Sequence, residues 1–424
     1  MKVILAFLGL TSHTPVILTL GLIIIIAFYF GRNIRYIKLP SIIGFMLFGV
    51  IIGPSFLNII NDDLQNQLSF ITDIALGFVA LSIGLELKLS SLKRFGKGII
   101  LIILLESLIA FLLVFTGIYL LTGNLPLALI FGAIAPASAP AGTVAVIREY
   151  KAKGSLTKAL YAVVGFDDGL GIIIFGFAAA LARGFLIQQT GTGSTNFFTM
   201  LFAPLREIVL SIVFGFIIAF IISKLLKRLK QSENRFVIIV GAIFVTCGLS
   251  KLFHLSLILT NMVVGMVIVN TQSNFVVKKT SELIPMLMPL LFILFFTLAG
   301  ANLHIAALPS LGLVGIVYIF TRTAGLISGS ILGGWIGKVE TKIRKYLGLG
   351  ILSQAGVAIG LALIVKQDFA GLGNVIDTTG GITTNGDFIG STVITTITAT
   401  CIFFELIGPI LTKVALRKAG EIED

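Results

Sequence analysis

Charged residues are scarce in this chain of 424 residues: Asp, Glu, Lys and Arg together make up 12% of it. A soluble globular protein has roughly 25%, so this sequence has too few charges to cover a surface that faces water. Cysteine is also scarce. The only two, Cys247 and Cys401, lie far apart in apolar segments, which excludes a disulfide framework and a cysteine metal site.

Motifs of enzymes and of ATP-driven pumps are absent as well. The sequence contains no nucleophile–base arrangement, no phosphate-binding glycine loop and no HExxH motif. We therefore expect neither an enzyme nor an ATP-driven pump, and no cofactor.

Apolar residues are what the sequence has in abundance. They form 57% of the chain, and the mean hydropathy is +1.07. Apolar runs of about 18 or more residues recur along the whole length, and each can cross a bilayer core of about 30 Å. The sequence thus predicts an all-α integral membrane protein that forms a single membrane domain over residues 1–424.

Thirteen transmembrane helices are expected. They lie approximately at 15–31, 39–59, 69–87, 98–121, 126–147, 158–184, 203–229, 236–253, 255–270, 282–301, 309–337, 346–366 and 388–415.

Basic residues are distributed unevenly between the two sides that these spans define. Of the 31 Lys and Arg residues, 25 fall in one set of connections, and the loops on the other side are polar but poor in cations. Cytoplasmic loops carry such an excess, so the N-terminus is predicted outside and the C-terminus in the cytoplasm of a plasma (inner) membrane. Topology accounts for the net charge of +12, and no nucleic-acid partner is expected.

Two spans have interruptions at corresponding places in the chain. Residues 126–147 contain Pro136 and Pro140, each of which removes a backbone donor. Residues 346–366 contain Ser353 and Gln354 among glycines. These are the fifth spans of two six-helix halves of opposite topology, an arrangement typical of secondary transporters. The expected fold is therefore two inverted six-helix repeats with crossed, broken helices, although a simple proline kink remains the alternative.

A pair of acidic residues is expected near the middle of the sixth span. Asp167 and Asp168 stand between Phe166 and Gly169. A carboxylate at bilayer depth costs several kcal/mol, so two in succession require a reason. A buried carboxylate can hold either a proton or a metal cation, and competition between them for one site is the chemistry of exchange.

Arg322 is the only basic residue placed deep in the membrane. Pairing with Asp167 or Asp168 would neutralise it, because an unpaired charge there is very costly. A purely structural Asp–Arg clamp is the alternative, although it explains one aspartate and not two.

Other acidic residues in the spans are less informative. Glu106 lies about a third of the way into its span, where either a supporting role beside the site or a helix–helix hydrogen bond would account for it. Asp73 and Glu405 are placed close to span ends, where contacts with loops suffice.

Several segments in this order resemble the monovalent cation:proton antiporters, specifically the branch with an Asp–Asp pair. The segments are "KLPSIIGFMLFGVIIGPS", "GFVALSIGLELKLSSLKR", "FDDG", "LFFTLAGANL", "LSQAGVAIGLAL" and "FFELIGPIL". They cover essentially the whole chain.

The resemblance implies an elevator-type transporter with a moving core (about 69–184 and 282–415 in part) and a dimerisation scaffold (about 15–59 and 203–270). It implies a homodimer that exchanges monovalent cations for protons. Asp168 would carry the cation and the proton (the metal would be Na⁺, Li⁺ or K⁺), with Asp167 assisting and Arg322 as the charge partner. Residues on or near the broken helices would line the site: Ala135, Ser138, Thr143, Ser353 and Gln354.

This sequence departs from the family's pattern in combining an Asp–Asp pair with arginine, where that branch often has lysine. Arginine does not release its proton in proteins, so the stoichiometry stays open. No nucleotide-binding domain is expected after the last span, and by resemblance this favours Na⁺ or Li⁺ over K⁺. A K⁺/H⁺ antiporter, or an ion-coupled symporter or channel on the same fold, remains the alternative.

Overall fold

The computed structural model describes residues 16–37, 41–189, 197–229, 231–253, 255–302, 308–378 and 381–422. Helices dominate it. They are α2 (Val16–Asn33), the 3-10 helix η1 (Ile34–Ile37), α3 (Ser41–Ile52), α4 (Asp62–Glu86), α5 (Leu89–Thr122), α6 (Leu125–Ile134), α7 (Pro140–Glu149), α8 (Ser155–Val164), α9 (Asp167–Gln189), α10 (Phe197–Arg228), α11 (Ser232–Leu252), α12 (Leu257–Thr271), α13 (Asn274–Ala301), α14 (Leu308–Ile336), α15 (Thr341–Gly350), α16 (Gly356–Asp368) and α17 (Asn385–Lys418).

Eight helical segments among the described residues are long and apolar enough to cross a membrane. Four of the other expected spans correspond wholly or partly to shorter apolar helices, at Ser41–Ile52, Leu125–Ile134, Leu257–Thr271 and Met286–Ala301. The apolar, membrane-spanning character is therefore confirmed, whereas the count of thirteen and the inverted repeats stay predictions.

One segment predicted as a polar loop contains a short hairpin. Strands β1 (Val375–Thr378) and β2 (Gly381–Thr384) pair antiparallel, with Val375 opposite Thr384. The expectation of a purely helical chain is wrong at this point, because two short segments that contain β-branched residues can pair outside the helices.

Helix boundaries follow local chemistry. Gly123 ends α5 with φ of 63°, a left-handed conformation that suits glycine. Asn124 then caps α6, and its side chain accepts a hydrogen bond from the Leu127 N–H at 3.0 Å. Pro126 follows in the first turn, where its missing N–H costs little. The chain thus reverses within two residues and directs α6 back into the molecule.

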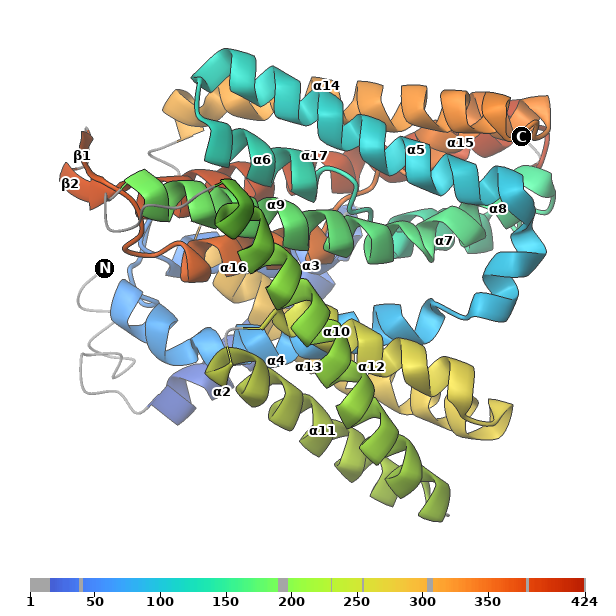
Figure 1. Cartoon of the computed structure of the whole chain (residues 1–424), viewed down its shortest axis with the longest axis horizontal. Coiled ribbons are helices and arrows are strands. Elements are labelled where there is room, and N and C mark those ends of the chain that lie inside the picture. The colour runs from blue at the N-terminus through green and yellow to red at the C-terminus, as the bar shows by residue number, and fades with distance from the viewer. Residues whose placement is uncertain are drawn as a thin grey trace.

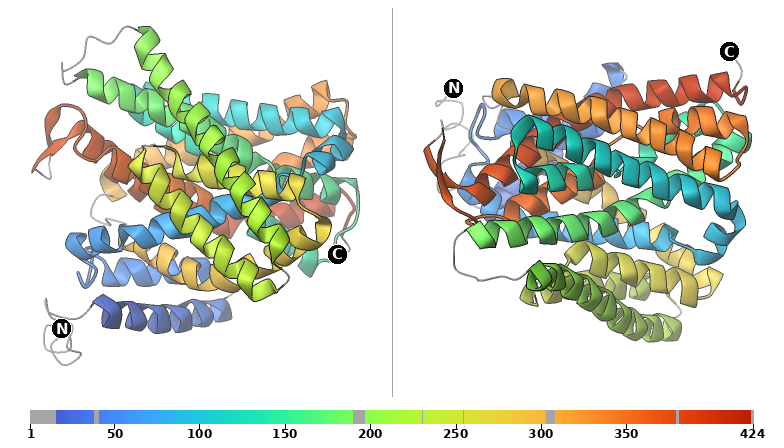
Figure 2. Two further views of the ribbon diagram at one scale, coloured as in Figure 1. Left: turned by 60° about the horizontal axis from the view of Figure 1, so that its bottom comes forward. Right: turned by 45° about the horizontal axis from the view of Figure 1, so that its top comes forward.

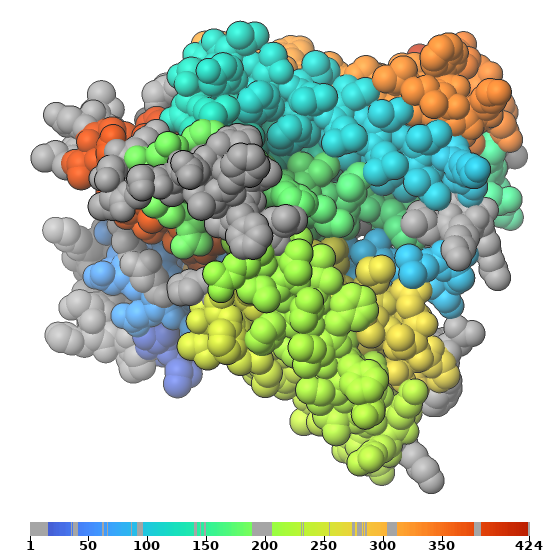
Figure 3. Space-filling view, in the orientation of Figure 1, coloured from blue at the N-terminus to red at the C-terminus, as the bar shows by residue number. Residues whose placement is uncertain are grey.

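The helices form two groups, and one of these groups contains the broken helices. Figure 1 shows α5 and α14 along one edge and α10, α11 and α12 along the opposite edge, with α6, α7, α9 and α16 between them. In the space-filling view, a band of green surface from residues of α7–α9 separates the cyan surface of α5 from the yellow-green surface of α10 and α11 (Figure 3). Helix α4 packs mainly on α12 and α13, and α13 packs on α3.

Glycines bring α5 and α14 into close contact. The two helices lie side by side in the views of Figures 1 and 2. Three glycines on α14 and one directly after it recur every four residues, and each faces α5 backbone: Gly325 at Ala110, Gly329 at Glu106, Gly333 at Ile102 and Gly337 at Gly98. Small residues at this spacing let membrane helices approach closely. The contact joins helices that come from the two halves of the chain.

We expect Gly329→Ala to destabilise the protein by ~1–3 kcal/mol. A Cβ at Gly329 would lie 2.5 Å from the Glu106 Cα and 2.7 Å from the Leu105 carbonyl oxygen. Both are backbone atoms, so the helices would have to separate. Thermal unfolding of the detergent-purified protein measures the effect. Gly312→Ala is the matched control, because it lies on the same helix with nothing within 4 Å; equal unfolding temperatures for the two variants would contradict the prediction.

Candidate functional site

Two helix breaks meet inside the molecule. The first, residues 135–139, separates α6 from α7, and the second, residues 351–355, separates α15 from α16. The Ala139 N–H donates to the Ser353 carbonyl at 2.8 Å, and the Thr143 hydroxyl donates to the Gly350 carbonyl at 2.7 Å. Both breaks predicted from the sequence are confirmed, and half-helices from the two halves of the chain lie against each other at these breaks.

Arg322, on α14, lies where these breaks meet and is fully buried. Its Nε donates to the Ala135 carbonyl at 2.9 Å, and its Nη2 donates to the Ala137 carbonyl at 3.0 Å. Its Nη1 donates to the Leu352 carbonyl at 2.8 Å. Helix C-termini carry partial negative charge, so the guanidinium compensates the carboxyl ends of α6 and α15.

Arg322 was predicted to pair directly with Asp167 or Asp168. Its hydrogen bonds show that this prediction is wrong. The guanidinium uses donors on all three of its nitrogens for backbone carbonyls, and its carbon lies 4.4 Å from the centre of the Phe404 ring. The physical reason is the crossing of the breaks, which leaves several carbonyls without helical donors at one place. Their combined partial charge takes the role expected of a carboxylate.

Gln354 continues this network. Its side-chain amide is fully buried, and its Nε2 donates to the carbonyls of Ile134 and Ala137, both at 3.2 Å. It also donates to the hydroxyl of Tyr318 at 2.9 Å. The second break therefore holds the first one in place through a side chain as well as through the backbone.

The two aspartates begin a helix. The expected sixth span is broken at Gly165 and Phe166, and Asp167 and Asp168 occupy the first turn of α9. They lie within one candidate membrane span, Ser155–Gln188, as expected, but the helix is interrupted directly before them. Acidic side chains are favoured at a helix N-terminus, where free N–H groups carry partial positive charge.

Ser138 connects the aspartates to the first break. Its hydroxyl donates to Asp167 Oδ2 at 2.6 Å, and its backbone N–H donates to Asp168 Oδ1 at 3.3 Å. Asp167 Oδ1 also accepts from the Asp168 N–H at 2.8 Å. Asp167 is fully buried and Asp168 is 3% exposed. Asp167 is thus tied into the protein by hydrogen bonds from Ser138 and from the backbone of α9.

Asp168 lines a cavity of 150 Å³, which we call the aspartate cavity. It lies between the two groups of helices. Its lining on one side comes from α3, α4 and α13: Ile42, Val79, Ser82, Ile83, Met288, Phe292 and Phe296. On the other side it comes from the broken spans and α17: Ser138, Ala139, Val164, Gly165, Asp168, Ala355, Gly356, Val357 and Glu405. Carboxylate and hydroxyl oxygens in such a cavity suit a small hard cation.

A second cavity, of 360 Å³, lies further along the same interface. We call it the polar cavity; charged residues in its lining are Asp73, Arg183, Glu207, Lys251 and Asp368. Asp73 and Val79, which belong to different cavities, are both on α4. Between them, Leu76 packs against Gly360 of α16, where an added Cβ would come within 2.2 Å of the leucine side chain. An apolar contact therefore lies between the two cavities.

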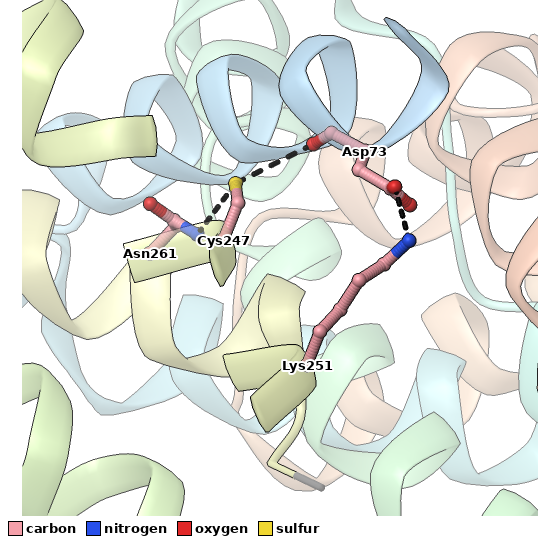
Figure 4. A network of polar contacts seen from close by, with 4 residues as sticks. All are labelled: Asp73, Cys247, Lys251 and Asn261. Atoms are coloured by element: carbon pink, nitrogen blue, oxygen red, sulfur yellow. Dashed lines mark hydrogen bonds and ion pairs between the residues drawn. The ribbon is translucent and has the colours of Figure 1, made fainter. Parts of the chain in front are cut away.

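The polar cavity contains an ion pair. Lys251 of α11 pairs with Asp73, which is 6% exposed, so loop contacts near a span end do not describe Asp73 adequately. Figure 4 shows the network around it. The Cys247 thiol lies 3.6 Å from the Asp73 carbonyl oxygen, and the Asn261 amide lies 3.7 Å from the sulfur. These contacts tie α4 to α11 and α12.

The remaining predicted residues lie around the crossing rather than in the aspartate cavity. Ala135 contributes a carbonyl to Arg322, Thr143 caps Gly350, and Ser353 is buried against Gly408 of α17. Glu106 is fully buried, accepts from the Ser107 hydroxyl at 2.8 Å, and interacts electrostatically with Asp167 and Arg322.

Four residues at the site were missed from the sequence. Tyr318, Leu352 and Phe404 complete the surroundings of Gln354 and Arg322, and Glu405 lines the aspartate cavity. Tyr318 lies one helical turn before Arg322 on α14, a spacing that could have indicated it. No sequence signal indicates the carbonyl of Leu352.

Comparisons with solved structures bear on the fold. The sodium proton antiporter MjNhaP1 of Methanocaldococcus jannaschii, solved at pH 8, is 22% identical with a TM-score of 0.75, over 95% of this chain and 98% of that chain. A structure of the same antiporter based on an electron-microscopy map is 21% identical with a TM-score of 0.68, over 96% and 98% of the respective chains. The chain therefore shares the fold of that antiporter.

Comparisons of sequence bear on the family. A curated relative, Na(+)/H(+) antiporter 1 of Methanocaldococcus jannaschii, is 29% identical over 158 residues, which span 36% of this chain and 37% of that relative's length. The profile of the transmembrane sodium/hydrogen exchangers matches residues 20–418. Because that match covers nearly the entire sequence, the chain belongs to the sodium/hydrogen exchanger family.

Proposed function

We propose that this protein is a secondary active antiporter that exchanges a monovalent cation, Na⁺ or Li⁺ in preference to K⁺, for protons. The observation that carries the proposal is the position of Asp168. Its carboxylate lines a cavity between two groups of helices, directly beside two crossing helix breaks. Cation and proton compete for this carboxylate, so that release of one allows binding of the other.

The contacts of Arg322 support this assignment, because its charge already compensates backbone carbonyls. Three broken-helix carbonyls occupy its donors, and the charge of the guanidinium is therefore committed to the crossing. The aspartates gain a positive field from the N-terminus of α9 and from a more distant Arg322. This arrangement favours an aspartate that remains exchangeable over a fixed ion pair.

Movement of one helix group past the other would give alternating access. We place α5–α9 and α14–α17 in the moving unit, and α2–α4 and α10–α13 in the scaffold. This division differs from the core expected over about 69–184 and, in part, 282–415. It assigns α4 and α13 to the scaffold, because α4 packs mainly on α12 and α13, and α13 packs on α3. The positions of the aspartate cavity and the polar cavity along α4 support it. A homodimer in a plasma membrane, joined through the scaffold, is part of the proposal.

Cation-dependent dissipation of a pH gradient in proteoliposomes tests the function. We expect Na⁺ or Li⁺ to collapse the gradient and K⁺ to act more weakly, with protein-free liposomes as the control. A preference for K⁺ would favour the K⁺/H⁺ alternative. If none of the three cations has an effect at any pH from about 6 to 9, although the protein is inserted, the antiport proposal is wrong and a symporter or channel is favoured.

A further inference from the structure

We propose that Glu405 is a second carboxylate ligand for the transported monovalent cation, and that it sets the apparent affinity of the aspartate cavity. The inference rests on the proposed function and extends it. It assigns to α17 a part of the binding site in addition to the aspartates of α9 and the serine of the first break.

Glu405 is buried inside the protein but opens into the same cavity as Asp168. It is 5% exposed, and both residues line the 150 Å³ space together with Ser138. Its carboxylate makes neither a hydrogen bond nor an ion pair with any part of the chain that the structure describes. A position near the end of a span therefore does not explain why an acidic residue is buried here.

An unsatisfied carboxylate in this environment is energetically unfavourable. Transfer of a charged group out of water costs several kcal/mol unless a partner compensates it. Ser138 and the backbone of α9 donate hydrogen bonds to Asp167. The Glu405 side chain instead faces the cavity. A cation in that cavity would supply the missing partner.

The helix around Glu405 leaves a main-chain carbonyl without its usual donor. Pro409 lies inside α17, four residues after Glu405. Proline has no N–H, so the Glu405 backbone carbonyl cannot accept the hydrogen bond that an α-helix normally provides at that position. Glu405 therefore carries a side chain and a main chain that both have spare acceptor capacity, and oxygen acceptors of these two kinds are suitable ligands for hard cations.

Two adjacent residues of α17 contact different parts of the site. The ring of Phe404 covers the Arg322 guanidinium, while Glu405 faces the cavity. Residues next to each other on a helix point about 100° apart, so one turn of α17 can close the buried side of the crossing and line the cation cavity. The arrangement keeps the arginine and the second carboxylate from neutralising each other directly.

The test compares Glu405→Gln, Glu405→Asp and wild type in the proteoliposome assay over a range of Na⁺ concentrations. Glutamine keeps the shape and removes the charge. We expect Glu405→Gln to raise the KM for Na⁺ about tenfold while Vmax changes less than about threefold, and Glu405→Asp to restore part of the affinity. Glu233→Gln, at an exposed acid of α11, is the matched control and should leave KM unchanged.

A KM for Glu405→Gln within about twofold of wild type would overturn the inference, and so would a loss of Vmax at constant KM, which indicates a structural role. A wild type that is inactive in the same assay would instead contradict the proposed function. In that case, equilibrium binding of ²²Na⁺ to the purified protein tests whether Glu405 binds the cation, since this measurement does not require transport. An unchanged dissociation constant in Glu405→Gln overturns the inference, whereas about tenfold weaker binding supports it.

Discussion

Replacing Asp168 by asparagine is expected to reduce cation-driven proton movement at least about 100-fold, equivalent to ~2.8 kcal/mol. Asparagine has almost the same shape and keeps an acceptor for the Ser138 N–H, which lies 3.3 Å from Asp168 Oδ1. It carries no charge and does not exchange a proton near neutral pH. The competition between cation and proton therefore disappears although the fold is kept. Dissipation of a pH gradient in proteoliposomes measures the loss.

Asp63→Asn is the control for this experiment. Asp63 is exposed in the first turn of α4, so the same chemical change there should leave transport within about twofold of wild type. Asp168→Asn with more than half of the wild-type rate, at equal protein insertion, would show that Asp168 is not the carrier. The carrier role would then have to be assigned to Glu405, the other acidic residue that lines the aspartate cavity.

Replacing Arg322 by leucine is expected to have the largest effect on stability. The substitution leaves the carbonyls of Ala135 and Leu352 without their side-chain donor, whereas the Ala137 carbonyl keeps the Gln354 amide. An unsatisfied buried polar group costs about 1–3 kcal/mol, so the combined loss is at least ~2 kcal/mol. The stability of Arg322→Lys should lie between those of wild type and Arg322→Leu. One ammonium group keeps the charge but lacks the planar fork that reaches three separate acceptors.

Thermal unfolding in detergent, followed by loss of monodisperse protein, measures these changes. Lys342→Leu is the control, since Lys342 is an exposed cation at the start of α15. An unfolding temperature of Arg322→Leu close to that of wild type would mean that the crossing is held by other contacts. Transport by a stable Arg322→Leu variant would further show that the guanidinium charge is dispensable for exchange.

The sequence predicted the broken helices well because their causes are local. Pro136 and Pro140 remove backbone donors within one span, and glycines surround Ser353 and Gln354 in the other. It did not predict the break before Asp167, because only Gly165 and Phe166 interrupt an otherwise continuous apolar pattern. A two-residue turn leaves the hydrophobic periodicity on both sides intact.

The partners of Arg322 could not be predicted for a different reason. Sequence reasoning pairs side chains, whereas this guanidinium binds carbonyls from segments that meet only in the folded protein. Glu405 was given no role at the site because it was judged by its distance from the end of a span, whereas it lines the aspartate cavity. The proline four residues later was the available signal, since it indicates a free carbonyl inside the helix.

The contacts of Arg322 also bear on how the chain is made. Arg322 follows the carbonyls of Ala135 and Ala137 by 187 and 185 residues in the sequence. At a synthesis rate of about 5–20 residues per second, the first broken helix waits on the order of 10–40 s for its arginine. During that time its unsatisfied carbonyls cannot be left in lipid. We therefore expect the half-finished chain to remain beside the insertion machinery until α14 emerges.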